Sequence, residues 1–251
     1  VRGVHAYLAL NTLISDAQMP DALALAQAAA AAGIDGVILQ DLGLAALLLQ
    51  AAPQLRLHAS TQLSVHTPAG LDFLAKRGFK RAVAARENSQ VQLRALCAHA
   101  RELGMEIEVF IHGALCMSVS GQCLLSAMLG GRSGNRGLCA GPCRLPFSVP
   151  GGTGYDLSLK DLSLLPHLHT LEQMGVASFK IEGRLKRPEY AAAAVGAARA
   201  VLNGDDPFKQ MQTLEKVFSR SGFTDGYFTG HPDAQMFGVR RPEDVANSRQ
   251  A

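Results

Sequence analysis

Gly33-Ile-Asp-Gly-Val-Ile-Leu-Gln-Asp41 is the stretch from which the fold can be predicted. A helical segment ends at its first glycine, a short apolar run follows, and polar residues come directly after that run. Glycine is favoured at the first position because it adopts the left-handed conformation that ends a helix. The same pattern recurs, with variations, at Gly78–Arg86, Gly104–His112 and Gly175–Gly183.

Two further strand-like runs, at Val4–Asn11 and Arg56–Gln62, bring the expected strands to six. Short strands that alternate with helices of about 10 to 15 residues predict a parallel sheet, and right-handed connections place successive strands side by side. The step from Gly104 to Gly175 is 71 residues, whereas the step from Gly78 to Gly104 is 26. The sequence therefore predicts an α/β fold with a long insertion after one strand.

Four of the five cysteines lie in that insertion, at Cys116, Cys123, Cys139 and Cys143. Four thiolates are a full ligand set for an iron-sulfur cluster or for structural zinc. Their gaps of six, fifteen and three residues contain no Cys-x-x-Cys pair, which favours iron and sulfur and leaves zinc as the alternative. Two disulfides would require an oxidising compartment, and no export signal supports one. We expect the four sulfurs to converge, and we expect Cys97 to be an ordinary packing thiol of a helix.

The composition excludes several classes of protein. With 251 residues, 48% of them hydrophobic and 18% charged, the chain can form one large core. No apolar run approaches the roughly 20 residues that a membrane span requires, so no membrane association is predicted. The net charge of +3 is uninformative, but Val109 to Tyr155 contains no Asp or Glu. Val1 is not a methionine, and we expect the chain to be part of a longer protein.

Polar residues gather where the predicted strands end, and function collects at the carboxyl ends of parallel strands. We predict catalytic roles for His112, Lys180, Glu182 and Arg184. For substrate binding we predict the strand-end residues Asn11, Asp41, Gln62, Arg86 and Glu87, together with Arg132, Arg136 and Arg144 of the acid-free segment. Arginines suit phosphate or carboxylate oxygens. The alternative is that His112 is a structural polar group and that the three arginines only brace the cysteine loop.

Several phrases of the sequence resemble the collagenase-like peptidase family U32. They include Asn11-Thr-Leu-Ile, Val37–Gly43, His58–Gln62, Ser158–Leu162 and Lys180-Ile-Glu-Gly-Arg184, and they occur in the order typical of the family. The resemblance implies a TIM-type βα barrel. Full-length members begin with two further βα units, so we expect a barrel that is incomplete at its N-terminus. The expected division is a partial barrel at 1–205, which contains the cysteine-rich insertion (114–155), and a C-terminal extension at 206–251.

The resemblance also implies a function. Several family members support hydroxylation of RNA and hold a 4Fe-4S cluster on four cysteines, which correspond here to the four insertion cysteines. By that resemblance the chain would act in the cytoplasm on a pyrimidine of ribosomal or transfer RNA, either forming 5-hydroxycytidine in large-subunit ribosomal RNA or modifying the wobble uridine, with prephenate as co-substrate. The sequence does not indicate which oligomeric state the protein adopts.

Two alternatives remain open. A collagenase-like peptidase would require a nucleophile or a hydrolytic metal, and the sequence contains neither a recognisable Ser–His pairing nor a His-Glu-x-x-His motif. The other alternative is a non-catalytic scaffold that bears a cluster and binds RNA or a partner chain.

Overall fold

The sheet at the centre of the chain contains the six parallel strands that the sequence predicts. The computed structural model describes residues 3–184 and 186–242. Neighbouring parallel strands follow one another in chain order, as expected. They are β1 (Tyr7–Leu10), β2 (Gly36–Leu39), β3 (Arg56–Ala59), β4 (Phe79–Val83), β5 (Glu106–Ala114) and β7 (Ser178–Ile181). The α/β fold with a mostly parallel sheet is therefore confirmed.

Two short strands were not predicted. β6 (Asp161–Ser163) runs antiparallel to the end of β5, and β8 (Phe223–Thr224) pairs with β6. Strands of three and two residues are too short to show a hydrophobic period, so only their partners reveal them. β8 connects the predicted C-terminal extension to the same sheet. The domain boundary at residue 205 stays a prediction.

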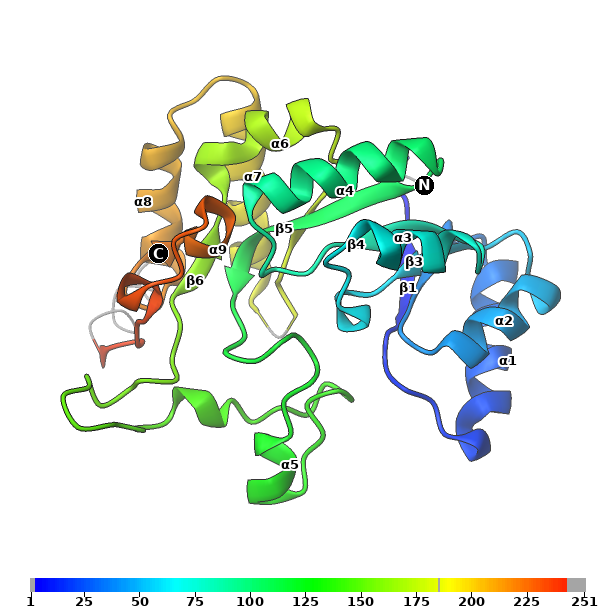
Figure 1. The fold of residues 1–251 in the computed structure, drawn as a ribbon, viewed down its shortest axis with the longest axis horizontal. Coiled ribbons are helices and arrows are strands. Elements are labelled where there is room, and N and C mark those ends of the chain that lie inside the picture. The colour runs from blue at the N-terminus through cyan, green and yellow to red at the C-terminus, as the bar shows by residue number, and fades with distance from the viewer. Residues whose placement is uncertain (1–2, 185, 243–251) are drawn as a thin grey trace.

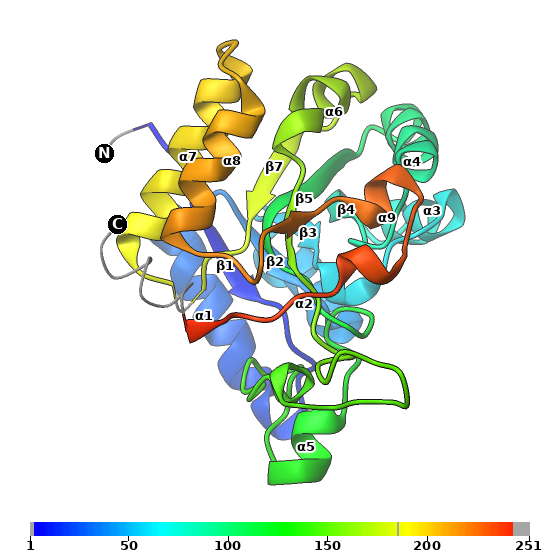
Figure 2. The ribbon, with the colours of Figure 1, turned by 90° about the vertical axis from the view of Figure 1, so that its left-hand side faces the viewer.

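Helices cover the outside of the sheet (Figures 1 and 2). The longer ones are α1 (Met19–Ala31), α2 (Leu42–Ala51), α3 (Pro68–Ala75), α4 (Gln90–Glu102), α6 (Leu168–Met174), α7 (Pro188–Leu202) and α8 (Pro207–Val217). Shorter ones are α5 (Leu125–Gly130), α9 (Gly226–Thr229), and the 3₁₀ turns η1 (Asp16–Gln18), η2 (Thr61–Leu63), η3 (Pro142–Arg144), η4 (Leu165–His167) and η5 (Ala234–Met236). In the described part of the chain no helix is long and apolar enough to cross a membrane.

The repeated glycines end helices as the sequence indicates. Gly33, Gly78, Gly104 and Gly175 all have positive φ, between 64° and 88°. Within residues 3–184 and 186–242, no strand joins β1 to β7, so the sheet is open between them. The incomplete TIM-type barrel remains our proposal for the parent architecture.

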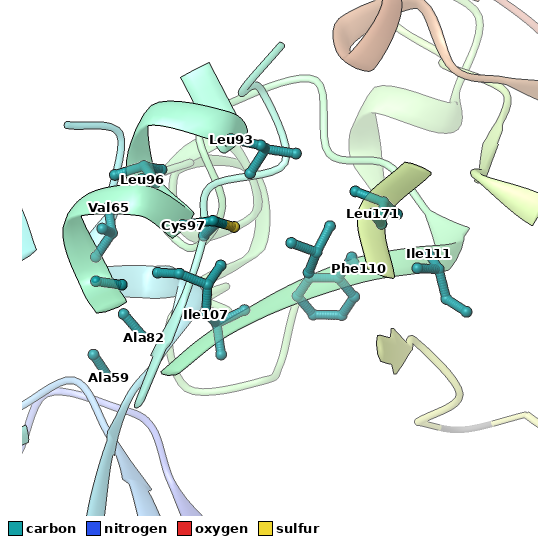
Figure 3. Close-up of a cluster of buried hydrophobic side chains, with 14 of the residues drawn as sticks. Ala59, Val65, Ala82, Leu93, Leu96, Cys97, Ile107, Phe110, Ile111 and Leu171 are labelled. Carbon is teal, nitrogen blue, oxygen red and sulfur yellow. The ribbon is translucent and has the colours of Figure 1, made fainter. Parts of the chain in front are cut away.

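The core lies between the helices and the sheet. Figure 3 shows Cys97 of α4 among Leu96, Ile107 of β5 and other buried apolar side chains. Cys97 is 3% exposed, and burial raises the pKa of its thiol to about 11. An un-ionised, enclosed thiol is a packing group, which confirms the expectation for this cysteine.

The remaining cysteines lie in residues 115–155, here named the cysteine segment. This segment leaves the carboxyl end of β5 and includes α5 and η3; the chain rejoins the sheet at β6. In Figure 1 it lies below the sheet, on the side toward which the β5 arrow points. The segment is thus adjacent to the edge where the parallel strands end.

Candidate functional site

A pocket of about 380 Å³ opens at the carboxyl ends of the parallel strands. Part of its lining is apolar, with Ala9, Ile38, Val83 and Phe110 contributed by four different strands. Six of the predicted catalytic and substrate-binding residues line it, namely Asn11, Gln62, Arg86, Lys180, Glu182 and Arg184. The cysteine segment completes the wall with Cys116, Ser120, Gly121 and Gly134. The expected gathering of strand-end residues at one site is therefore observed for six of the nine predicted strand-end residues.

Arg86 and Glu182 join two strand ends across this pocket. The guanidinium Nη2 lies 3.0 Å from the Glu182 carboxylate, and Nη1 donates to the Ala114 carbonyl at 2.7 Å. The same guanidinium lies 3.9 Å from the centre of the Phe110 ring. Ion pairing, backbone contact and ring stacking together fix Arg86 in one orientation. Its charge is neutralised by Glu182 within the pocket wall.

A second ion pair lies deeper. Lys180 Nζ is 2.6 Å from Glu108 Oε1, and Arg81 Nη1 is 3.2 Å from Glu108 Oε2. Burial opposes ionisation of Glu108, but Lys180 and Arg81 outweigh that effect and hold its pKa below the ordinary value. A carboxylate placed between two cations stays charged in a dry environment. Glu108 therefore fixes the Lys180 ammonium at the pocket wall.

His112 lies away from the pocket wall, because β5 has a bulge. Against β7, the register shifts between Phe110 and His112, so the two-residue alternation that would place both side chains on one face is broken. The His112 ring packs 5.7 Å from Tyr190 and 5.2 Å from Phe223. It is 1% exposed, and neither ring nitrogen has a partner among the described residues. Burial, with a contribution from Lys186, lowers its pKa to about 4. The predicted catalytic role gains no support from this position.

The other predicted residues also lie off the pocket wall. Asp41 caps α2 by accepting from the Leu44 amide at 2.9 Å. Glu87 lies 3.8 Å from His66. The arginines contact protein groups: Arg132 donates to the Leu138 carbonyl, Arg136 to Gln18 and the Leu13 carbonyl, and Arg144 to Ser158 and the Leu159 and Leu115 carbonyls. The bracing alternative describes all three arginines in this structure.

Sequence reasoning missed Asn135, which connects the cysteine segment to three strand ends. Its Nδ2 donates to the side-chain oxygens of Gln40 and Gln62, each at 2.7 Å. Its Oδ1 accepts from the Leu13 amide at 3.1 Å. These partners are 73 to 122 residues away along the chain, so no local signal marks this asparagine. Asn135 holds the segment against the pocket.

Two of the four segment cysteines accept a backbone N–H from two residues further on. The Leu125 amide donates to Cys123 Sγ at 3.4 Å, and the Gly141 amide donates to Cys139 Sγ at 3.3 Å. Amide hydrogen bonds to sulfur stabilise thiolates and tune iron-sulfur clusters. The local backbone is therefore suited to thiolate ligands.

The Cys116 thiol is close enough to Cys143 and Cys123 for both to act on its pKa. Burial raises the pKa of Cys116, and the thiols of Cys143 and Cys123 raise it further, whereas Arg86 lowers it. Gly134 lies between Cys123 and Cys139, because a Cβ on it would be 3.4 Å from the carbonyl oxygen of the first and 3.8 Å from Cβ of the second. Across the described ranges no group of three or more His, Cys, Asp or Glu is arranged to hold a metal ion. The convergence of the four sulfurs on one cluster stays a prediction.

The chain belongs to peptidase family U32, whose sequence profile matches residues 1–238. It is 38% identical, over 80% of its length, to the 23S rRNA 5-hydroxycytidine C2501 synthase of Escherichia coli, covering 31% of that protein. It is 30% identical to tRNA hydroxylation protein P1 of Bacillus subtilis over 94% of this chain and 60% of that protein. A collagenase of Porphyromonas gingivalis is 33% identical, over 91% of this chain and 60% of its own length. The chain thus spans between 31% and 60% of these relatives.

Proposed function

We propose that the chain carries the site of an enzyme that hydroxylates a pyrimidine in RNA. The observation that carries the proposal is the shared wall of the pocket: Cys116 of the cysteine segment lines the same pocket as Arg86, Lys180 and Glu182. Relatives named for ribosomal and transfer RNA hydroxylation support the substrate class. The proposed products are 5-hydroxycytidine in large-subunit ribosomal RNA or a hydroxylated wobble uridine in transfer RNA. A cytoplasmic location goes with either substrate.

The pocket suits a flat heterocycle. Its volume of about 380 Å³ falls within the range of small-molecule sites. Phe110 and the aliphatic side chains offer contact area, while the Asn11 and Gln62 amides offer donors and acceptors for the edge of a base. Arg184 is exposed at the pocket, where it would meet a carboxylate or phosphate. Prephenate is the proposed co-substrate by family resemblance, and its carboxylates would suit that guanidinium.

We further propose that Cys116, Cys123, Cys139 and Cys143 bind one 4Fe-4S cluster. Four thiolate donors, two of them with amide hydrogen bonds, fit this group. When bound, the cluster would supply one-electron chemistry beside the pocket. Asn135 would hold the cysteine segment against the strand ends, and Arg86 would hold the Ala114 carbonyl at the start of the segment.

Iron content tests the cluster. Serine at any of the four positions should remove iron from protein purified without oxygen, while Cys97→Ser, the matched control, should keep both iron and the broad visible absorption of a cluster. Full iron in Cys139→Ser would reject this ligand set. A colourless wild-type protein that contains zinc would replace the cluster with a structural metal.

RNA analysis tests the activity. The gene is deleted, and modified nucleosides of ribosomal and transfer RNA are measured by mass spectrometry. Loss of one hydroxylated pyrimidine, restored by the wild-type gene, supports the proposal. If every hydroxylated pyrimidine persists after the deletion, the proposed hydroxylation activity is rejected. A protein that binds iron and RNA but modifies neither ribosomal nor transfer RNA would then be the non-catalytic scaffold.

Peptidase activity is the second candidate because collagenases are among the relatives. The residues that line this pocket include the hydroxyl side chains Ser60, Thr61 and Ser120, but no histidine is among them. Ser60 Oγ already accepts from the Gln62 amide at 3.2 Å. An activated nucleophile needs an adjacent base. Cleavage of denatured collagen by the purified protein, abolished by Ser60→Ala or Ser120→Ala, would favour this candidate.

A further inference from the structure

The turn that follows β7 has cations on both of its sides. The Lys186 amide donates to the Gly183 carbonyl at 2.9 Å, which closes the turn. Gly183 and Arg184 line the pocket. Lys186 instead lies against the aromatic side chains beyond it, with Nζ 2.9 Å from the centre of the Phe218 ring and 5.5 Å from that of Tyr190. The turn therefore connects the pocket to a second cationic surface.

More positive charge surrounds the same ring. The Arg220 guanidinium lies 5.4 Å from the Phe218 centre and the Arg240 guanidinium 4.4 Å from it. Arg220 pairs with Asp161, which is 2% exposed and already engaged. Lys186 forms no ion pair with a carboxylate anywhere in residues 3–184 and 186–242. The two guanidiniums repel the Lys186 ammonium, whereas the Asp161 and Glu182 carboxylates attract it without coming within ion-pairing distance.

The titration of Lys186 agrees with that geometry. Burial, followed by Arg220, lowers its pKa to about 8, although Asp161 acts in the opposite direction. An anion at this position would relieve the repulsion.

We propose that Arg184 and Lys186, with Arg220 behind them, form a phosphate-binding surface for the RNA strand whose base enters the pocket. This inference rests on the proposed function and adds the path of the backbone: one phosphodiester lies at the pocket mouth on Arg184, and the next lies over Lys186 beside Phe218. Backbone contacts of this kind position a strand without reading its sequence. The pocket, not this surface, would then select the base.

Salt dependence of RNA binding tests the surface. Affinity of a short pyrimidine-containing single-stranded RNA is measured against KCl for the wild type, Lys186→Gln, Lys186→Arg and the matched control Lys209→Gln, which removes an exposed lysine of α8. Losing one phosphate contact should reduce the slope of log K against log salt by about 0.7. Lys186→Gln should show that reduction, and Lys186→Arg and Lys209→Gln should not. A wild-type slope in Lys186→Gln overturns the inference.

Chemical labelling of the unmodified protein provides a measurement that does not depend on a variant folding. Acylation rates of Lys186 and Lys209 are followed by mass spectrometry with and without the RNA. RNA should slow labelling of Lys186 several-fold and leave Lys209 unchanged; equal rates for Lys186 in both conditions contradict the proposal. If neither the RNA affinity nor the labelling rate depends on Lys186 while the hydroxylated nucleoside still depends on the gene, the phosphate-binding surface is wrong and the proposed function stands. If the wild-type protein binds no RNA, the phosphate-binding surface and the proposed function are both wrong.

Discussion

Replacing His112 with phenylalanine should make the protein less sensitive to acid. The imidazole is 1% exposed, and its pKa falls from 6.5 to about 4 because burial disfavours the charged ring. In the unfolded chain the ring regains its ordinary pKa and binds a proton first. Stability from this group is therefore complete above pH 6.5, declines as pH falls, and is lost below pH 4. A difference of about 2.5 units corresponds to about 3 kcal/mol in total, of which about 2 kcal/mol is lost by pH 5.

Urea unfolding between pH 7.5 and pH 4.5 measures this effect. His58 has the same lowered pKa of about 4, so the wild type carries two such contributions and His112→Phe carries one. Because neither nitrogen of His112 has a hydrogen-bond partner in the described structure, the phenyl ring should fit with little loss of stability at pH 7. Between pH 7 and pH 5, the free energy of unfolding of His112→Phe should fall by about 2 kcal/mol less than that of the wild type.

His231→Phe, at an exposed position, is the control and should follow the wild-type pH dependence. If His112→Phe loses as much stability on acidification as the wild type, the buried, neutral His112 described above is wrong. If the variant keeps its stability but loses RNA hydroxylation in cells, the catalytic role predicted from sequence is restored.

Three further substitutions test how the site is held. Asn135→Ala removes three hydrogen bonds of about 1 kcal/mol each, so trypsin should cleave the cysteine segment roughly 100-fold faster. Asn203→Ala, at the exposed C-cap of α7, should leave cleavage unchanged, and equal rates for the two variants would refute the anchoring role. Glu108→Gln removes the carboxylate partner of Lys180 and one of the two carboxylates that pair with Arg81, and it should cost about 3 kcal/mol in urea unfolding; wild-type stability would contradict this. Gly113→Ala should lower the free energy of unfolding by more than about 1 kcal/mol, because φ is 123° and the new Cβ would be 2.7 Å from Glu182 Cβ. Gly196→Ala, in an open stretch of α7, should instead stabilise the protein. Similar thermal midpoints for the two variants would contradict this expectation.

The repeated units could be predicted because each carries its own local signals. A glycine with positive φ, an apolar run and polar strand-end residues all fall within nine residues at Gly33–Asp41. β6 and β8 offer no such period, since their pairing depends on partners elsewhere in the chain. Pattern reasoning therefore located the six parallel strands and the shared edge, and missed the strands that connect the C-terminal residues to it.

The site was only partly predictable, for similar reasons. Arg86, Lys180 and Glu182 were found because strand ends share an edge. His112 was misplaced because a bulge in β5 changes which face its side chain takes, and composition does not reveal a bulge. The lack of acidic residues in the segment indicated its positive charge but not which groups its arginines contact. Arg144, for example, donates to the Leu159 and Leu115 carbonyls, which come together only in the folded chain.

Complementation of a deletion strain, read out by mass spectrometry of RNA nucleosides, tests most directly whether the pocket and the cysteine segment form one hydroxylation site. The wild-type gene and Cys97→Ser should restore the hydroxylated pyrimidine. Arg86→Met, which alters the pocket wall, and Cys139→Ser, which alters the segment, should both fail to restore it at normal protein levels. Restoration by both of these variants would contradict a shared site, and restoration by Cys139→Ser alone would separate the cysteines from the reaction.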